Sequence, residues 1–172
     1  SGLVSLFGAE AGLGETAGAL HMLSVLLAYF VGAAASGALL RQSFLQLGRR
    51  YGAVLALESV LLAGAAAVLS SGGSGGDCLA AMACGLQNAM ATSYSGAVIR
   101  TTHMTGIVTD LGIAFGHALR GQPVDRVRLQ LYGALLAGFL TGSALGAVGY
   151  AHLGFAVLFI PSVLAGAAGV SY

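Results

Sequence analysis

Lysine and tryptophan are both absent from this sequence, and charged side chains of any kind are scarce. Only 8% of the 172 residues are charged, against about 25% in ordinary soluble domains. So few charges cannot make a surface that faces water on all sides, so we expect lipid to be the solvent for most of it. The formal net charge is +1 and no basic tract is interleaved with aromatics, so nothing indicates nucleic-acid binding.

The sequence is also poor in residues that build metal, redox or catalytic sites. Its two cysteines, Cys78 and Cys84, are six positions apart on one expected helix, which is too far for a disulfide. No Cys/His spacing is typical of metal ligands. No nucleophile elbow, Walker loop or dinucleotide fingerprint is present. We therefore expect neither an enzyme nor a metal site, and the sequence indicates no particular cofactor.

What the sequence has in abundance is apolar residues, at 57% of the chain with a mean hydropathy of +0.88. A helix needs about 20 apolar residues to cross the hydrocarbon core of a bilayer. The long apolar stretches are residues 22–40, 52–69, 129–151 and 153–170, and shorter ones are residues 78–92 and 106–119. The alternating segments of membrane β-barrels are missing. The predicted fold class is therefore all-α, a polytopic helical integral membrane protein.

Small residues recur at helical spacing within these stretches. They let helix backbones approach closely where water supplies no driving force for association. The predicted helix-packing positions are Gly8, Gly12, Gly32, Ser36, Gly112, Gly116, Gly138, Gly142 and Gly146. The two pairs at 8/12 and 112/116 are expected to bring two half-helices into contact.

Three blocks of sequence occur twice in the same order. SGLVSLFGAEAG at residues 1–12 resembles TGIVTDLGIAFG at 105–116. AYFVGAAASGAL from Ala28 resembles AGFLTGSALGAV from Ala137, and SVLLAGAAAV from Ser59 resembles SVLAGAAGV from Ser162. This order predicts a duplication, with repeat one at residues 1–71, a Gly/Ser linker at 72–77 and repeat two at 78–172. The helix that leads repeat two has no counterpart within residues 1–71, so we expect that this counterpart either precedes Ser1 or was lost.

The loop arginines indicate that the two repeats have opposite orientations in the membrane. In repeat one they follow the long apolar stretch, and in repeat two they precede it. Because basic loops stay cytoplasmic, loops 41–51 and 120–128 are predicted on the same, cytoplasmic-equivalent side. Such inverted repeats are typical of transporters, whose binding site lies at the repeat interface near the bilayer midplane.

The segment RTTHMTGIVTDLG, residues 100–112, concentrates polar side chains in this apolar chain. The predicted topology leaves one net crossing for residues 78–119, which are too many for one straight helix. We therefore predict a broken or re-entrant helix around residues 96–106, which only a cavity or surrounding protein can accommodate. The predicted lining of a substrate or ion cavity is Arg100, Thr101, Thr102, His103, Thr105, Asp110, Gln87 and Asn88.

The charged residues of this region each allow two interpretations. Arg100 clamps an anionic substrate, or it forms a structural ion pair with an acidic residue such as Asp110, Glu58 or Glu10. Asp110 binds a cation or relays protons, or it only complements the N-terminus of its helix. His103 carries protons, or it is a histidine that is simply hydrogen-bonded. Each of these alternatives stays open from the sequence.

The segment CGLQNAMATSYSGAVIRTTHMTGIVTDLG, residues 84–112, resembles the signature of the YoaK family, bacterial membrane proteins grouped under a domain of unknown function. The matching motifs are residues 85–89, 101–106 and 111–112, and the resemblance covers essentially the whole chain. It implies a polytopic helical protein, with no catalytic or binding role that can be carried over. Members usually begin with an extra apolar helix ending in Met-Ser/Thr-Gly-Asn, whereas this chain has Leu3 in place of the Asn.

We predict a small-solute transporter or permease with a polar site at the repeat interface. The contrasting prediction is a structural or accessory subunit of a larger membrane complex. In both cases the partners are the lipid bilayer and either other membrane subunits or further copies of this chain. The expected location is a bacterial inner membrane or an organellar membrane.

Overall fold

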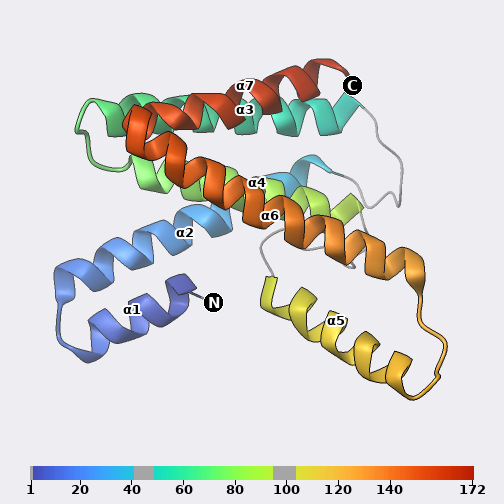
Figure 1. Cartoon of the computed structure of the whole chain (residues 1–172). Helices are drawn as coiled ribbons and strands as arrows, with labels where there is room; N and C mark the ends of the chain where they lie inside the picture. Colours follow the sequence, from blue (N-terminus) through green and yellow to red (C-terminus); the bar gives the residue numbers. More distant parts are fainter. Residues whose placement is uncertain (1, 41–48, 95–103) are drawn as a thin grey trace.

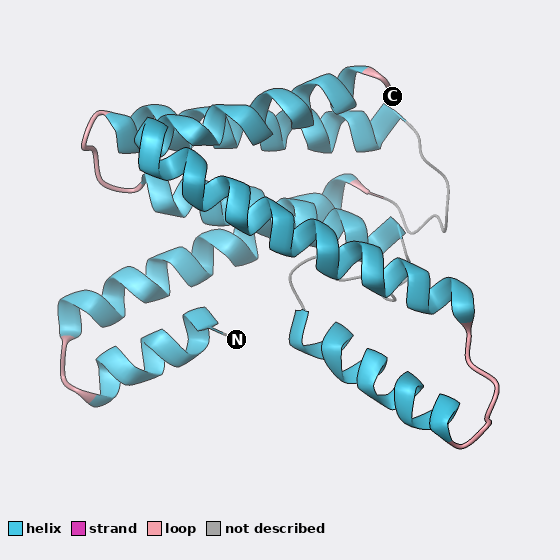
Figure 2. Cartoon of the chain, in the orientation of Figure 1, coloured by secondary structure: helices cyan, strands magenta, loops and turns pink. Residues whose placement is uncertain are grey.

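The computed structural model describes residues 2–40, 49–94 and 104–172, and these are helical apart from short turns (Figure 1; Figure 2). In chain order the elements are α1 (Gly2–Gly12), α2 (Thr16–Leu39), α3 (Arg49–Ser70), α4 (Gly76–Tyr94), α5 (Met104–Leu119), α6 (Arg126–Leu153), the 3₁₀ turn η1 (Gly154–Leu158) and α7 (Phe159–Val170). The predicted all-α fold class is confirmed. Of the predicted break around residues 96–106, residues 96–103 lie outside the described part of the chain.

Three helical stretches are long and apolar enough to cross a membrane. They are α2, α3 and the 45-residue run formed by α6, η1 and α7. Large apolar side chains cover their outside, such as Phe30 with 67% of its surface exposed and Leu145 with 72%. Exposed apolar surface on this scale is expected of a protein whose solvent is lipid. The chain is therefore a helical protein of the membrane type.

The helix boundaries shorten both predicted arginine loops. The carboxylate of Asp125 accepts a hydrogen bond from the Arg128 backbone N–H at 3.1 Å and so caps the start of α6. Residues 126–128 of the predicted 120–128 loop are consequently helical. Likewise α3 begins at Arg49, so the end of the predicted 41–51 loop is helical, and residues 41–48 lie outside the described residues.

The last two predicted apolar stretches form one bent helical run. Gly154, at the end of α6, has a φ of +56°, which side-chain-bearing residues rarely adopt. The chain bends there into η1 and then α7. Pro161 is the third residue of α7, where its missing N–H costs little because first-turn N–H groups have no helical partner.

The closest helix contact is between α2 and α4, which run parallel and cross at two glycines (Figure 1). A Cβ atom on Gly32 would collide with the carbonyl oxygen of Met82, and one on Gly85 would collide with the carbonyl oxygen of Tyr29. Near the N-terminal ends of the same helices, His21 Nε2 lies 2.7 Å from Asp77 Oδ2. The glycines thus allow backbone-to-backbone packing, and Gly32 lies at a position predicted for it.

Helices α3 and α7 pack antiparallel (Figure 1), and they meet at the two serines that begin the third repeated block. The Ser162 hydroxyl donates to the Ser59 carbonyl at 2.8 Å, and the two hydroxyls are 3.4 Å apart. Equivalent residues of two antiparallel helices face each other when a local twofold axis relates the helices. Ser59 and Ser162 begin the two copies of this block, and the inverted repeat and its boundaries stay predictions.

Replacing Ser162 with alanine removes the hydrogen bond to the Ser59 carbonyl. We expect the free energy of unfolding to fall by only about 0.6 kcal/mol, the average for hydrogen bonds between membrane helices. Thermal unfolding in a mild detergent measures the change. Ser71→Ala is the control, because the Ser71 hydroxyl bonds the Val68 carbonyl within its own helix end. A loss several times larger would mean that the contact does more than join α3 to α7.

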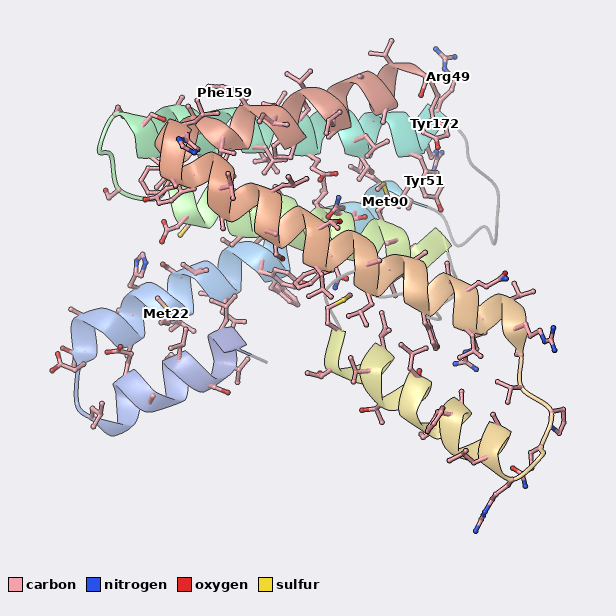
Figure 3. All side chains as sticks on the ribbon, in the orientation of Figure 1. Met22, Arg49, Tyr51, Met90, Phe159 and Tyr172 are labelled. Carbon is pink, nitrogen blue, oxygen red and sulfur yellow. The ribbon has the colours of Figure 1, made fainter. Side chains whose placement is uncertain are left out.

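A small core lies where α2, α3 and α4 come together, near the 41–48 connection. It consists of Leu40, Tyr51, Val54 and Leu86, with Met90 packed against it (Figure 3). Val54 and Leu86 have no exposed surface at all. These residues form a hydrophobic core cluster of the described chain.

Helices α1 and α5 do not make the contact with each other that the small-residue prediction expects. Helix α1 packs on α2 and α5 packs on α6, and within the described residues α1 and α5 do not contact each other. Open space surrounds Gly8, Gly12, Gly112 and Gly116, so these pairs do not join two half-helices. The reason is that short turns, at residues 13–15 and 120–125, tie each helix to its neighbour in sequence. The α6 positions Gly138, Gly142 and Gly146 likewise have no neighbour within the described chain.

Candidate functional site

A cavity of about 220 Å³ lies between α5 and α6, next to the turn that joins them. Figure 3 shows the side chains of these two helices. The lining residues are Asp110, Ile113, Ala114 and His117 of α5, Pro123, Val124 and Asp125 of the turn, and Arg128, Leu129 and Tyr132 of α6. The cavity combines an apolar wall with acidic, basic and phenolic groups, a mixture that is typical of small-molecule sites.

Helical spacing explains how the sequence brings these side chains together. Asp110, Ala114 and His117 are separated by four and three residues, so they share one face of α5. Arg128 and Tyr132 are separated by four residues on α6. Gly121, with a φ of +68°, lets the chain reverse directly after α5. The hairpin thereby sets the polar face of α5 against the first turns of α6.

Tyr132 holds Arg128 at the rim of the cavity. The Arg128 Nε donates to the Tyr132 hydroxyl at 2.9 Å, and the guanidinium carbon lies 5.3 Å from the centre of the Tyr132 ring. Tyr132 is buried with 4% of its surface exposed, whereas Arg128 is exposed. A guanidinium has five N–H donors, and the bond to Tyr132 uses one of them. The buried ring therefore positions a cation that faces solvent and the cavity.

Two carboxylates act on the same guanidinium. Asp110 and Asp125 both attract Arg128 electrostatically, one from α5 and one from the turn. Asp125 is already engaged in capping α6. Asp110, which is partly buried, is therefore the acidic group of the cavity that is free of a capping role. Charges of both signs thus line one small space.

Of the residues predicted from the sequence to line a cavity, Asp110 lines this one. Thr105 is exposed at the start of α5, and Gln87 is exposed on α4. Asn88 donates from Nδ2 to the Tyr29 hydroxyl at 2.7 Å and thus joins α4 to α2. The other predicted residues, Arg100, Thr101, Thr102 and His103, lie outside the described residues.

The cavity also differs in place from the predicted site. The prediction put the site at the interface of the two repeats, whereas this cavity lies inside the α5–α6 hairpin, within the predicted repeat two. The reason is that the described part of α5 packs only on α6, so its polar face meets α6. His117, Asp125, Arg128 and Tyr132 were not predicted as site residues, although the spacing of Arg128 and Tyr132 is a signal that sequence alone carries.

Metal binding finds no support in the described residues, among which no three His, Cys, Asp or Glu side chains are arranged to hold an ion.

Comparison with known proteins gives a family and no function. The family model that matches is described as a protein of unknown function (DUF1275), and it covers residues 1–171. No curated protein and no solved structure matches the chain. Because the family match runs over nearly the whole sequence, the chain belongs to the DUF1275 family of proteins of unknown function.

Proposed function

We propose that this protein is a permease for a small polar solute and that the α5–α6 cavity is its binding site. The observation that carries the proposal is Asp110, an ionisable residue on an apolar helix that lines a cavity beside Arg128. Charged groups in membrane segments are costly, and where they line a cavity they usually mark the path of a substrate or an ion.

The size and charge of the cavity restrict the solute. A volume of about 220 Å³ is suited to a small molecule or a small polar group. Arg128 on one wall attracts an anionic group, and Asp110 on the other attracts a cationic group or a hydrogen-bond donor. We therefore propose a solute that carries a hydrogen-bond donor or cation together with an acceptor or anion.

We further propose that the solute enters from the side of the basic loops. It lies next to the 120–125 turn, which carries Arg120 and leads into Arg126 and Arg128. If the basic loops stay on the cytoplasmic-equivalent side, the cavity opens to that side. The described arrangement then corresponds to an inward-open state of the permease.

Uptake into liposomes tests this proposal. The purified chain is reconstituted and offered a panel of small polar solutes, including amino acids and carboxylic acids. For a solute that is taken up, Asp110→Asn should raise the concentration that gives half-maximal uptake by tenfold or more. A tenfold rise corresponds to about 1.4 kcal/mol of binding free energy. Glu15→Gln is the control, because Glu15 lies in the exposed turn between α1 and α2. If uptake is equal in the wild type and in Asp110→Asn, the cavity is not part of the transport path.

The second candidate function is an accessory subunit of a larger membrane complex. It is favoured by one observation, the exposed face of α6 with the glycine stripe 138/142/146 and no neighbour in the described chain. Purification in a mild detergent separates the two candidates. A chain that is pure and active in uptake supports the permease, and a chain that purifies with a fixed set of other membrane proteins and transports nothing supports the subunit.

A further inference from the structure

Glu58 is a carboxylate buried in the helix core, far from the cavity described above. It lies near the middle of α3, one of the three stretches able to cross a membrane, and only 4% of its surface is exposed. Its Oε2 atom is buried and has no hydrogen-bond partner among the described residues. An ionised carboxylate in such surroundings is strongly disfavoured, because nothing replaces the water that it has lost.

A second buried polar atom without a partner lies on α2. The Ser36 hydroxyl on α2 has no exposed surface and no hydrogen-bond partner in the described chain. Leu40 follows Ser36 by one turn and Val54 precedes Glu58 by one turn, and both belong to the core cluster with Leu86. Ser36 and Glu58 therefore each lie one helical turn away from a residue of this cluster, on α2 and on α3.

The described helices around Glu58 supply no cation. From α4, Cys84 lies close enough to interact electrostatically with Glu58. Elements η1 and α7 contain no titratable residue. The titratable groups of the other packed helices are engaged elsewhere. His21 of α2 pairs with Asp77 of α4, next to Cys78, and the Tyr29 hydroxyl of α2 accepts a hydrogen bond from Asn88. On α3 itself, Arg49 and Arg50 are exposed at its first turn and Tyr51 is nearly two turns from Glu58.

We propose that Glu58 is an internal proton-binding site, which is protonated while the α2–α3–α4 core is closed and exchanges its proton with water when the core opens. In binding, the carboxylate takes one proton from water and becomes a neutral carboxyl group, and in release it returns that proton to water. The neutral group needs no cationic partner. A metal cation would need several oxygen ligands at once, which one carboxylate and one hydroxyl do not supply.

The proton site gives the proposed permease a coupling ion, and only this consequence depends on the proposed function. Intramembrane carboxylates that change protonation are the usual carriers of protons in pumps and transporters. Glu58 lies in a different helix group from Asp110, so solute and proton would be held at separate places. Movement of the core helices would then link release of the proton to the state of the cavity.

Infrared difference spectroscopy of the protein in liposomes tests the proton site without any solute. The wild type should show a protonated-carboxyl band at neutral pH that shifts in deuterated water and disappears reversibly as pH rises. The band should be missing from Glu58→Gln and present in Asp110→Asn. Glu58→Asp serves as a second variant, because it keeps the carboxyl and should move the band without removing it.

Three outcomes would overturn the proposal. The first is a wild-type spectrum without such a band, and the second is a band that persists in Glu58→Gln. The third is a band that never responds to pH, because it would show a carboxyl that does not exchange its proton. If the band titrates as expected while no solute is transported, the proton site stands and the permease proposal fails. If uptake occurs and its dependence on a pH gradient is unchanged in Glu58→Gln, the permease stands and the coupling role of Glu58 fails.

Discussion

Replacing Gly32 with valine should abolish stable folding of the protein. The Cβ atom of any larger residue at position 32 collides with the carbonyl oxygen of Met82, which is backbone and cannot turn aside. Overpacking of a core costs about 1–3 kcal/mol where side chains can adjust, and a clash with backbone exceeds that range. Since the marginal stability of a domain is about 5–15 kcal/mol, separation of α2 from α4 should leave little folded protein. Gly85→Val should have the same effect, because its Cβ meets the carbonyl oxygen of Tyr29.

The matched control for this experiment lies on the same helix. Gly37 of α2 has no atom within 4 Å of the position of a Cβ, so Gly37→Val introduces the same side chain without the clash. The measurement is the yield of monodisperse protein in mild detergent and its midpoint of thermal unfolding. If Gly32→Val and Gly37→Val behave alike, the close crossing of α2 and α4 does not exist in the membrane.

Leu86→Ala should destabilise the protein by about 2–5 kcal/mol, the range for truncating a buried leucine. Leu86 has no exposed surface and packs with Leu40, Tyr51 and Val54, so alanine leaves a void among three helices. Packing contacts are the main force between membrane helices, because lipid is as apolar as the leucine itself. The loss should therefore appear in full as a lower midpoint of unfolding.

Leu27→Ala is the control for Leu86→Ala. Leu27 has 55% of its surface exposed on α2, a stretch that is able to cross the membrane. Lipid contacts and protein contacts are of similar strength for this exposed side chain, so its truncation should cost well under about 1 kcal/mol. Equal losses from the two variants would contradict the assignment of the core to the junction of α2, α3 and α4.

The polar residues differ in how far their placement depends on the tertiary structure. Asp110, a rare carboxylate next to a polar segment, was predicted to line a cavity at the repeat interface, and the structure places it in a different cavity, inside the α5–α6 hairpin. Tyr132 and Arg128 were not predicted to join it, because their role depends on α5 folding back along α6. The sequence offered Glu58 only as a candidate ion-pair partner of Arg100, and its lack of a hydrogen-bond partner among the described residues depends on which helices surround it.

The sequence by itself determined the all-helical fold and its membrane character. Both follow from composition and from the length of apolar stretches, which are properties of each segment alone. It also indicated that small residues would bring helices together, as Gly32 of α2 does where it packs against α4.

Only the tertiary structure decided which of those small residues make contact and where polar groups meet. Gly32 and Gly112 look alike in sequence, yet one is pressed against a backbone carbonyl and the other faces open space. The physical reason is that an apolar helix packs equally well against lipid and against another helix until a specific pair of surfaces fits. That fit depends on side chains far apart in the chain, and no local pattern contains it.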